Sequence, residues 1–142
     1  MKNFKNFLFY GASAKENLGS LGLLILRVVA GLLMMTHGWS KIQNFEGMVQ
    51  GGFDPIGMGP TLSVVLLIAA EFIAALFIVF GLLTRLSTIP LMVAMSVASF
   101  VAHAGDPLEI KELSLVYLTI FAVLFITGAG KYSFDRLFFK KR

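Results

Sequence analysis

The sequence predicts an all-α integral membrane protein, a bundle of four membrane-spanning helices with both termini in the cytoplasm and amphipathic ends at the membrane interface. Hydrophobic residues make up 57% of the 142 residues, and charged residues make up 14%. Ordinary soluble domains carry about 25% charged residues. A soluble four-helix bundle needs charged outer faces, which the apolar stretches of this chain lack, so the composition favours the membrane class.

We expect one membrane domain over residues 1–142, because four apolar stretches approach the length of about 20 residues that a helix needs to cross a bilayer. The expected spans are approximately 18–40, 62–83, 86–104 and 113–129. Segments rich in glycine, proline or charge separate these stretches and are expected to end the helices. The first connecting segment, 42–60, keeps several apolar residues, and we expect it to fold over the mouth of the bundle as a cap.

Both ends of the chain combine basic and aromatic residues. Residues 1–17 are interpreted either as a short helix in the membrane interface or as a frayed tail. The tail 131–142 carries five lysine and arginine residues among aromatic ones. That pattern is typical of an amphipathic helix lying on anionic lipid.

The distribution of lysine and arginine predicts the orientation of the chain. Nine of the twelve fall on the side of the two termini, two fall on the other side, and one lies within a span. Cytoplasmic loops carry the excess of positive charge, so both termini are expected in the cytoplasm. The same division accounts for the net charge of +4 without a nucleic-acid partner.

Arg27 and Glu71 are the two charged residues deep inside the expected spans. A charge near the middle of a bilayer costs roughly 2.5–3.5 kcal/mol on the insertion scale, so it needs a partner in the protein interior. Each residue lies near the middle of its span, and we therefore predict a buried ion pair between them. The pair could fix the helix register, or it could relay protons or anchor a polar ligand head group.

Four polar residues end three of the spans on the side opposite the termini. These are His37, Lys41, His103 and Glu112. Histidine exchanges protons near neutral pH and can donate to a quinone carbonyl, and lysine and glutamate can assist proton transfer. We predict that the four form a quinone or substrate mouth; solvated helix ends are the alternative.

Other chemistries have weaker support in the sequence. The chain has no cysteine, which excludes thiolate nucleophiles and cysteine-bound iron–sulfur clusters. No metal site and no catalytic residue is predicted, and haem ligation by the two histidines is a lesser alternative. The methionines are interpreted as apolar packing.

The motifs along the chain resemble those of a known family. They comprise Arg27, Gly31, His37-Gly38, Lys41, Glu71, Gly81-Leu82-Leu83-Thr84-Arg85, His103 and Gly128-x-Gly130-x-Tyr132-Ser133-x-Asp135. In this order they resemble the DoxX family, over nearly the whole chain from Leu18 to Asp135. The resemblance implies a four-helix protein of the bacterial inner membrane. The founding member of the family is a subunit of a thiosulfate:quinone oxidoreductase.

The resemblance directs the functional hypothesis. We expect the membrane subunit of a quinone-linked oxidoreductase complex, with quinone as its non-covalent cofactor. The expected partners are the lipid bilayer, a protein of the same complex and further copies of the chain. The sequence shows no flavin or nicotinamide motif, so electrons would come from a partner or directly from the substrate. The alternative is a non-enzymatic assembly subunit or a small-molecule conduit.

Overall fold

The computed structural model describes residues 17–139, which form helices and connecting turns with no β-strand. Four helical stretches in this range are long and apolar enough to cross a membrane. They are Gly19–Gln43, Pro60–Phe80, Thr84–Ala102 and Leu108–Thr127. The prediction of an all-α, four-span protein is therefore confirmed, and the predicted bounds differ from these by a few residues. The segment 1–16, one of the two expected amphipathic ends, lies outside the described residues.

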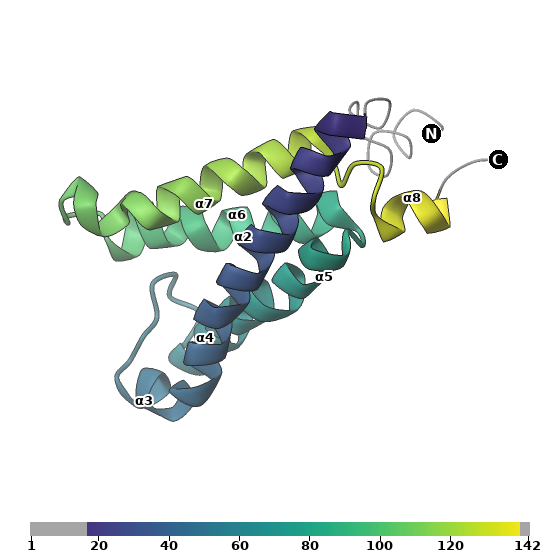
Figure 1. Cartoon of the computed structure of the whole chain (residues 1–142). Coiled ribbons are helices and arrows are strands. Elements are labelled where there is room, and N and C mark those ends of the chain that lie inside the picture. The colour runs from purple at the N-terminus through teal and green to yellow at the C-terminus, as the bar shows by residue number, and fades with distance from the viewer. Residues whose placement is uncertain (1–16, 140–142) are drawn as a thin grey trace, which may run out of the picture.

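The first two spans form one helical hairpin. Its first arm is α2 (Asn17–Gln43), and a short helix, α3 (Phe45–Gln50), follows in the connection. The returning arm consists of α4 (Pro60–Ile68), the π-helix η2 (Ala69–Ala74) and α5 (Ala75–Phe80). The main neighbours of α3 are α4 and α2. The helix α3 thus lies at the tip of its own hairpin (Figure 1), and a cap over the bundle mouth by the rest of the connection stays a prediction.

The last two spans form the second hairpin. It consists of α6 (Thr84–Val97), the π-helix η3 (Ala98–Ala102) and α7 (Leu108–Thr127), and the chain then continues into α8 (Phe134–Phe139). Within α8, Leu137 and Phe138 expose 70% and 64% of their surface. A helix in the tail is confirmed, and its contact with lipid stays a prediction.

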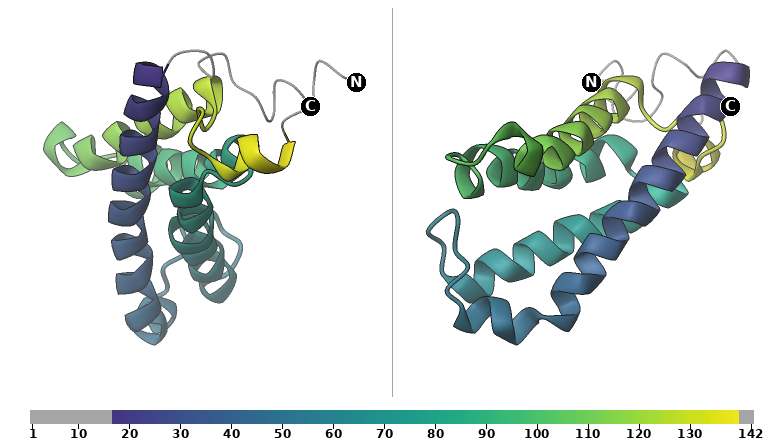
Figure 2. Two further views of the ribbon diagram at one scale, coloured as in Figure 1. Left: turned by 45° about the vertical axis from the view of Figure 1, so that its right-hand side comes forward. Right: turned by 60° about the vertical axis from the view of Figure 1, so that its left-hand side comes forward.

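The two hairpins meet at one end of the molecule and diverge toward the other (Figures 1 and 2). They meet where α2 begins, where α5 passes into α6 and where α8 lies. We call this the packed end. They diverge toward α3 and the turn between η3 and α7, which we call the open end.

Small residues allow α2 to lie close against the returning arm of its hairpin. A Cβ atom on Gly31 would lie 2.6 Å from Val79 Cγ2, and one on Gly38 would lie 2.9 Å from the backbone carbon of Glu71. Real side chains do not approach so closely, so both positions exclude any residue larger than glycine without movement of the helices. Such small-residue contacts are common between membrane helices.

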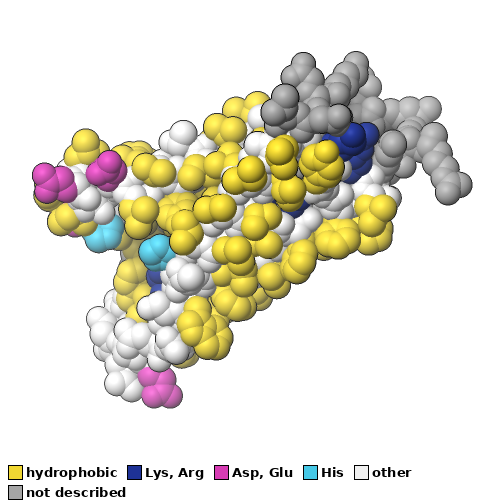
Figure 3. All heavy atoms as spheres, in the orientation of Figure 1, with side chains coloured by type: hydrophobic (Ala, Val, Ile, Leu, Met, Phe, Trp, Pro, Cys, Tyr) yellow, Lys and Arg dark blue, Asp and Glu magenta, His cyan; other side chains and the backbone are white. Residues whose placement is uncertain are grey.

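The surface agrees with a protein that crosses a membrane. Large hydrophobic side chains are exposed on every span, for example Ile25 at 57%, Ile73 at 53%, Val93 at 58% and Ile126 at 67%. Figure 3 shows hydrophobic side chains along the length of the bundle, with charged ones gathered at its two ends. An exposed apolar belt of this size is unfavourable in water but stable in contact with lipid.

Candidate functional site

At the packed end, Arg27 is bound by backbone carbonyl groups. Its guanidinium Nη1 donates to the carbonyl oxygens of Val79 at 2.8 Å and Ile78 at 3.3 Å, and Nη2 donates to that of Tyr132. The residue is 2% exposed. The Val79 carbonyl lies in the last turn of α5, where carbonyls lack a partner four residues further along the helix, and the Ile78 carbonyl also accepts from the Gly81 N–H at 3.0 Å. A cation at this position also complements the helix dipole.

The predicted ion pair between Arg27 and Glu71 is therefore wrong. Arg27 meets the end of α5, whereas Glu71 lies about two helical turns, or about 10 Å, further along the same arm. Glu71 instead accepts a hydrogen bond from Lys41, with Nζ 2.5 Å from Oε2. The prediction rested on the similar depth of the two residues in their spans. In the structure each charged group binds a different partner, Arg27 the carbonyls at the end of α5 and Glu71 the side chain of Lys41.

A carboxylate completes the packed end. Asp135 is 2% exposed, and its two oxygens accept hydrogen bonds from the backbone N–H groups of Leu83 at 2.5 Å and Thr84 at 2.9 Å. Burial raises the pKa of Asp135, although those hydrogen bonds and the charge of Arg27 act in the opposite direction. The side chain caps the start of α6, a position where anionic groups are favoured. Arg85, at the start of the third span, joins this end to the fourth span, because its Nη2 donates to the Ile126 carbonyl at 2.7 Å.

At the open end, the Lys41–Glu71 pair lies beside a cavity. The side chain of Glu71 is 5% exposed and that of Lys41 is 24% exposed, so the pair leads from the protein interior toward the surface. The cavity has a volume of about 180 Å³ and lies between the two hairpins. It is lined by Met34, His37, Glu71, Met95, Ala98, His103, Ile110, Leu113, Ser114 and Tyr117.

Three of the polar groups in this cavity have defined neighbours. The ring of His37 meets Tyr117 edge-on, with centroids 6.0 Å apart, and Tyr117 stacks on Phe121 at 5.9 Å. His103 Nδ1 lies 2.7 Å from Asp106 Oδ2. His37 is thus oriented by another lining residue, Tyr117, and His103 by Asp106, which is not among the lining residues. The two histidines of the chain are coloured cyan in Figure 3.

The structure thus brings together part of the predicted mouth. His37 and His103 line the cavity, and Lys41 reaches it through Glu71. Glu112 is exposed and is not among the lining residues. Sequence reasoning missed Tyr117, although a signal existed, because it is the one tyrosine within the four expected spans.

Both π-helices adjoin the cavity. Glu71 lies within η2, Ala98 begins η3, and His103 follows directly after η3 ends. A π-helix inserts an extra residue into a turn and is frequently found at functional sites. Here it changes the direction in which the following side chains point, and in both hairpins that change falls at the depth of the cavity.

These features define a class, a small multi-pass membrane protein with a polar cavity between two helical hairpins. Comparison with known proteins gives the family. The family model named DoxX matches residues 22–104, from α2 to just beyond η3, and the chain belongs to the DoxX family. The resemblance stated from the motifs is confirmed.

Curated relatives match most of the chain. Inner membrane protein YqjF of Escherichia coli (strain K12) is 34% identical over 130 residues, which cover 89% of this chain and 98% of that protein. An uncharacterized protein of Haemophilus influenzae is 31% identical over 126 residues, covering 84% and 92%. With four apolar helices and such a relative, the chain is a multi-pass inner-membrane protein.

A third relative matches a shorter region. "Putative oxidoreductase CatD" of Bacillus subtilis is 39% identical over 66 residues, 46% of this chain and 48% of that protein. No solved structure matches the chain.

Proposed function

We propose that this protein is the membrane subunit of a quinone-linked oxidoreductase complex and that the open-end cavity holds the quinone ring. The observation that carries the proposal is the convergence of His37, Glu71 and Tyr117 on one cavity between otherwise apolar spans. A relative named as an oxidoreductase supports the same reaction class. The electrons would come from a partner subunit or directly from its substrate.

The lining groups suit a quinone. Quinone carbonyls accept hydrogen bonds, which an imidazole N–H and a phenolic hydroxyl can supply, and reduction to the quinol takes up two protons. Glu71 and Lys41 form a hydrogen-bonded path from the cavity to the surface. Together they offer donors for the ring and a route for its protons.

The size of the cavity limits what can bind. Pockets that bury a drug-sized ligand have volumes of about 300–1,000 Å³, whereas this one has about 180 Å³. It therefore suits a single ring, with an isoprenoid tail left in the bilayer. Ile110 and Leu113 line the cavity and expose 54% and 53% of their surface, so the tail would leave past apolar side chains.

Fluorescence of Trp39 tests the proposal. Trp39 is the single tryptophan, and its ring lies 6.1 Å from that of Phe72, the residue after Glu71. Titration of the purified chain with a short-tailed ubiquinone should quench this fluorescence. Tyr117→Phe and His37→Ala should each weaken the apparent affinity about tenfold, the value of one good hydrogen bond.

The matched control is Thr119→Ala. Thr119 is also on α7, is exposed, and donates to its own helix at Leu115, so its loss should leave the affinity unchanged. Equal quinone affinity in all variants and in the natural chain would contradict the proposal, and the histidines would then be solvated helix ends.

Gentle purification is a second test. Co-purified quinone supports the proposal, and a stoichiometric partner protein without redox activity supports an assembly role.

We also propose that the packed end faces the cytoplasm, which places both termini there. The support is the predominance of lysine and arginine on that side of the expected spans. Cysteine introduced at Gly52 or Gly105, at the open end, should react in intact cells with a thiol reagent that does not cross the inner membrane. Cysteine introduced at Ser133 should not react. Labelling at Ser133 alone would reverse the assigned orientation.

A further inference from the structure

A second, larger cavity lies at the packed end, outside the proposed quinone site. Its volume is about 820 Å³, and it opens between the end of α5 and the segment that leads into α8. It is lined by Phe80, Lys131, Tyr132, Ser133, Phe134, Arg136 and Leu137. Nothing in the reaction proposed above uses it.

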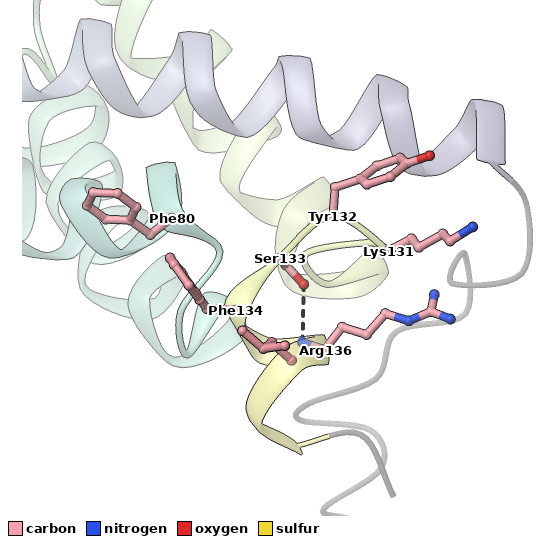
Figure 4. A pocket seen from close by; sticks show the side chains of 7 residues that line it. Phe80, Lys131, Tyr132, Ser133, Phe134 and Arg136 are labelled. Carbon is pink, nitrogen blue, oxygen red and sulfur yellow. Dashed lines mark hydrogen bonds between the residues drawn. The ribbon is translucent and has the colours of Figure 1, made fainter. Parts of the chain in front are cut away.

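The lining of this cavity has a cationic side and an aromatic side. Figure 4 shows Lys131 and Arg136 extending to the same side as the Tyr132 ring, while Phe80 and Phe134 lie together on the other. The rings of Phe80 and Phe134 are 6.0 Å apart. Lys131 Nζ lies 5.8 Å from the centroid of the Tyr132 ring. A ligand that fills the cavity would meet both positive charge and an apolar wall.

The position of the cavity points to lipid. Phe80 is the last residue of the second span and Thr127 ends the fourth, so the cavity lies where the spans leave the hydrocarbon layer. Leu137, on its apolar side, is 70% exposed. Head groups and acyl chains meet at this depth, and tyrosine, lysine and arginine are the residues that commonly bind there.

We propose that this cavity binds one anionic phospholipid, with the phosphate between Lys131 and Arg136 and an acyl chain along Phe134 and Leu137. Arginine binds phosphate through paired N–H groups, and lysine adds a point charge. A neutral lipid would satisfy the aromatic side alone. The complementary charge therefore selects an anionic head group, and phosphatidylglycerol is the probe of that class.

Hydrogen bonds hold the backbone under this site in place. The Tyr132 carbonyl accepts from Arg27, the Ser133 hydroxyl donates to the Gly130 carbonyl at 2.9 Å, and the Arg136 N–H donates to Ser133 Oγ at 3.3 Å. The site is thus largely formed before lipid binds. Because the same segment carries Asp135, which caps α6, bound lipid should also stabilise the packed end.

The test uses the purified full chain in a neutral detergent, titrated with phosphatidylglycerol, while the thermal midpoint is followed. The midpoint should rise with phosphatidylglycerol and much less with phosphatidylcholine. In Lys131→Gln/Arg136→Gln the apparent affinity should fall about 30-fold, or about fivefold for each cation. Comparing each variant with and without lipid separates binding from any loss of stability in the variant itself.

Control variants make the outcome specific. Lys111→Gln removes a cation at the open end, where Lys111 donates to the Ala104 carbonyl at 3.4 Å, and should keep the full response; Lys131→Arg should keep it as well. An unchanged response in the double variant would overturn the proposal. An equal response to phosphatidylcholine, or to inorganic phosphate alone, would overturn it too, because either result shows that the cavity does not recognise an anionic lipid as a whole.

Discussion

The two ends of the molecule use the same kinds of charged side chain for opposite purposes. At the packed end Arg27 donates to backbone carbonyls and Asp135 accepts from backbone N–H groups. Both are 2% exposed, and together they close the junction of α2, α5 and α6. At the open end Lys41 and Glu71 bind each other, and a cavity lies beside the pair.

The difference shows how a membrane protein can keep buried charge without forming buried ion pairs. The last carbonyls and first N–H groups of a helix lack partners within the helix. A charged side chain placed there therefore provides hydrogen bonds for these backbone groups and for its own polar atoms. Glu71 has no such helix end beside it. It relies on one side chain that reaches the surface, which leaves it within reach of a ligand.

The largest effect is expected from Gly81→Ala at the packed end. Gly81 has φ +65°, and a Cβ atom there would lie 2.3 Å from Arg27 Nη1 and 2.7 Å from Ser133 Cβ. Backbone strain and overpacking each cost about 1–3 kcal/mol, so we expect a loss of about 4 kcal/mol in the free energy of unfolding. Denaturant titration in detergent measures it.

Gly52→Ala separates strain from crowding. Gly52 has a similar φ of +73°, but a Cβ atom there would meet nothing within 4 Å. This variant should lose about 1 kcal/mol, the cost of strain alone. Equal losses in the two variants would mean that the guanidinium of Arg27 moves aside at no cost, and the packed end would not be as rigid as its hydrogen bonds indicate.

A smaller effect is expected from breaking the open-end pair. Lys41→Met leaves the Glu71 carboxylate buried and should cost about 3 kcal/mol, near the lower limit for buried pairs because Lys41 is partly exposed. Lys41→Met/Glu71→Leu should recover most of that loss. Combining Arg27→Met with Glu71→Leu should instead give additive losses, within about 0.5 kcal/mol. Strong coupling between Arg27 and Glu71 would contradict the separation of the two ends.

The smallest effect concerns Asp54, whose carboxylate binds the turn that leads into α4 at the tip of the open end. Asp54 accepts hydrogen bonds from Ser63 Oγ at 2.5 Å and from the N–H groups of Met58 and Gly59, and these bonds, that from Ser63 foremost, lower the pKa of Asp54. A lowered folded-state pKa gives stability that is present above the ordinary value near 4 and is lost as the pH falls through the folded value.

Acidification from about pH 5 to about pH 3 should therefore reduce the protection of the Met58 and Gly59 amides from hydrogen exchange, after correction for the intrinsic rate. Asp54→Asn should abolish this pH dependence. Protection that is constant with pH in the natural chain would show that the carboxylate does not hold the turn.

The spans and the positions of the histidines could be predicted because they depend on local properties, namely apolar length and helix-ending residues. The partner of Arg27 could not. It depends on the position of α2 along the returning arm of its hairpin, and that position is determined by the close approach of the two helices at Gly31 and Gly38. The two π-helices could not be predicted either, since no residue type marks them. They nevertheless affect where the side chains of Glu71 and His103 point, because Glu71 lies within η2 and His103 directly follows η3.

The contact between Arg27 and Tyr132 has a consequence for biogenesis. Synthesis delivers Arg27 with the first span, whereas the Tyr132 carbonyl arrives 105 residues later, after the fourth span. Until then the guanidinium can meet only the carbonyls of α5, and the start of α6 lacks its Asp135 cap. A ribosome that has just completed the last span has therefore produced four helices whose common junction is unfinished. The segment that follows the fourth span, with Tyr132 and Asp135, completes this junction.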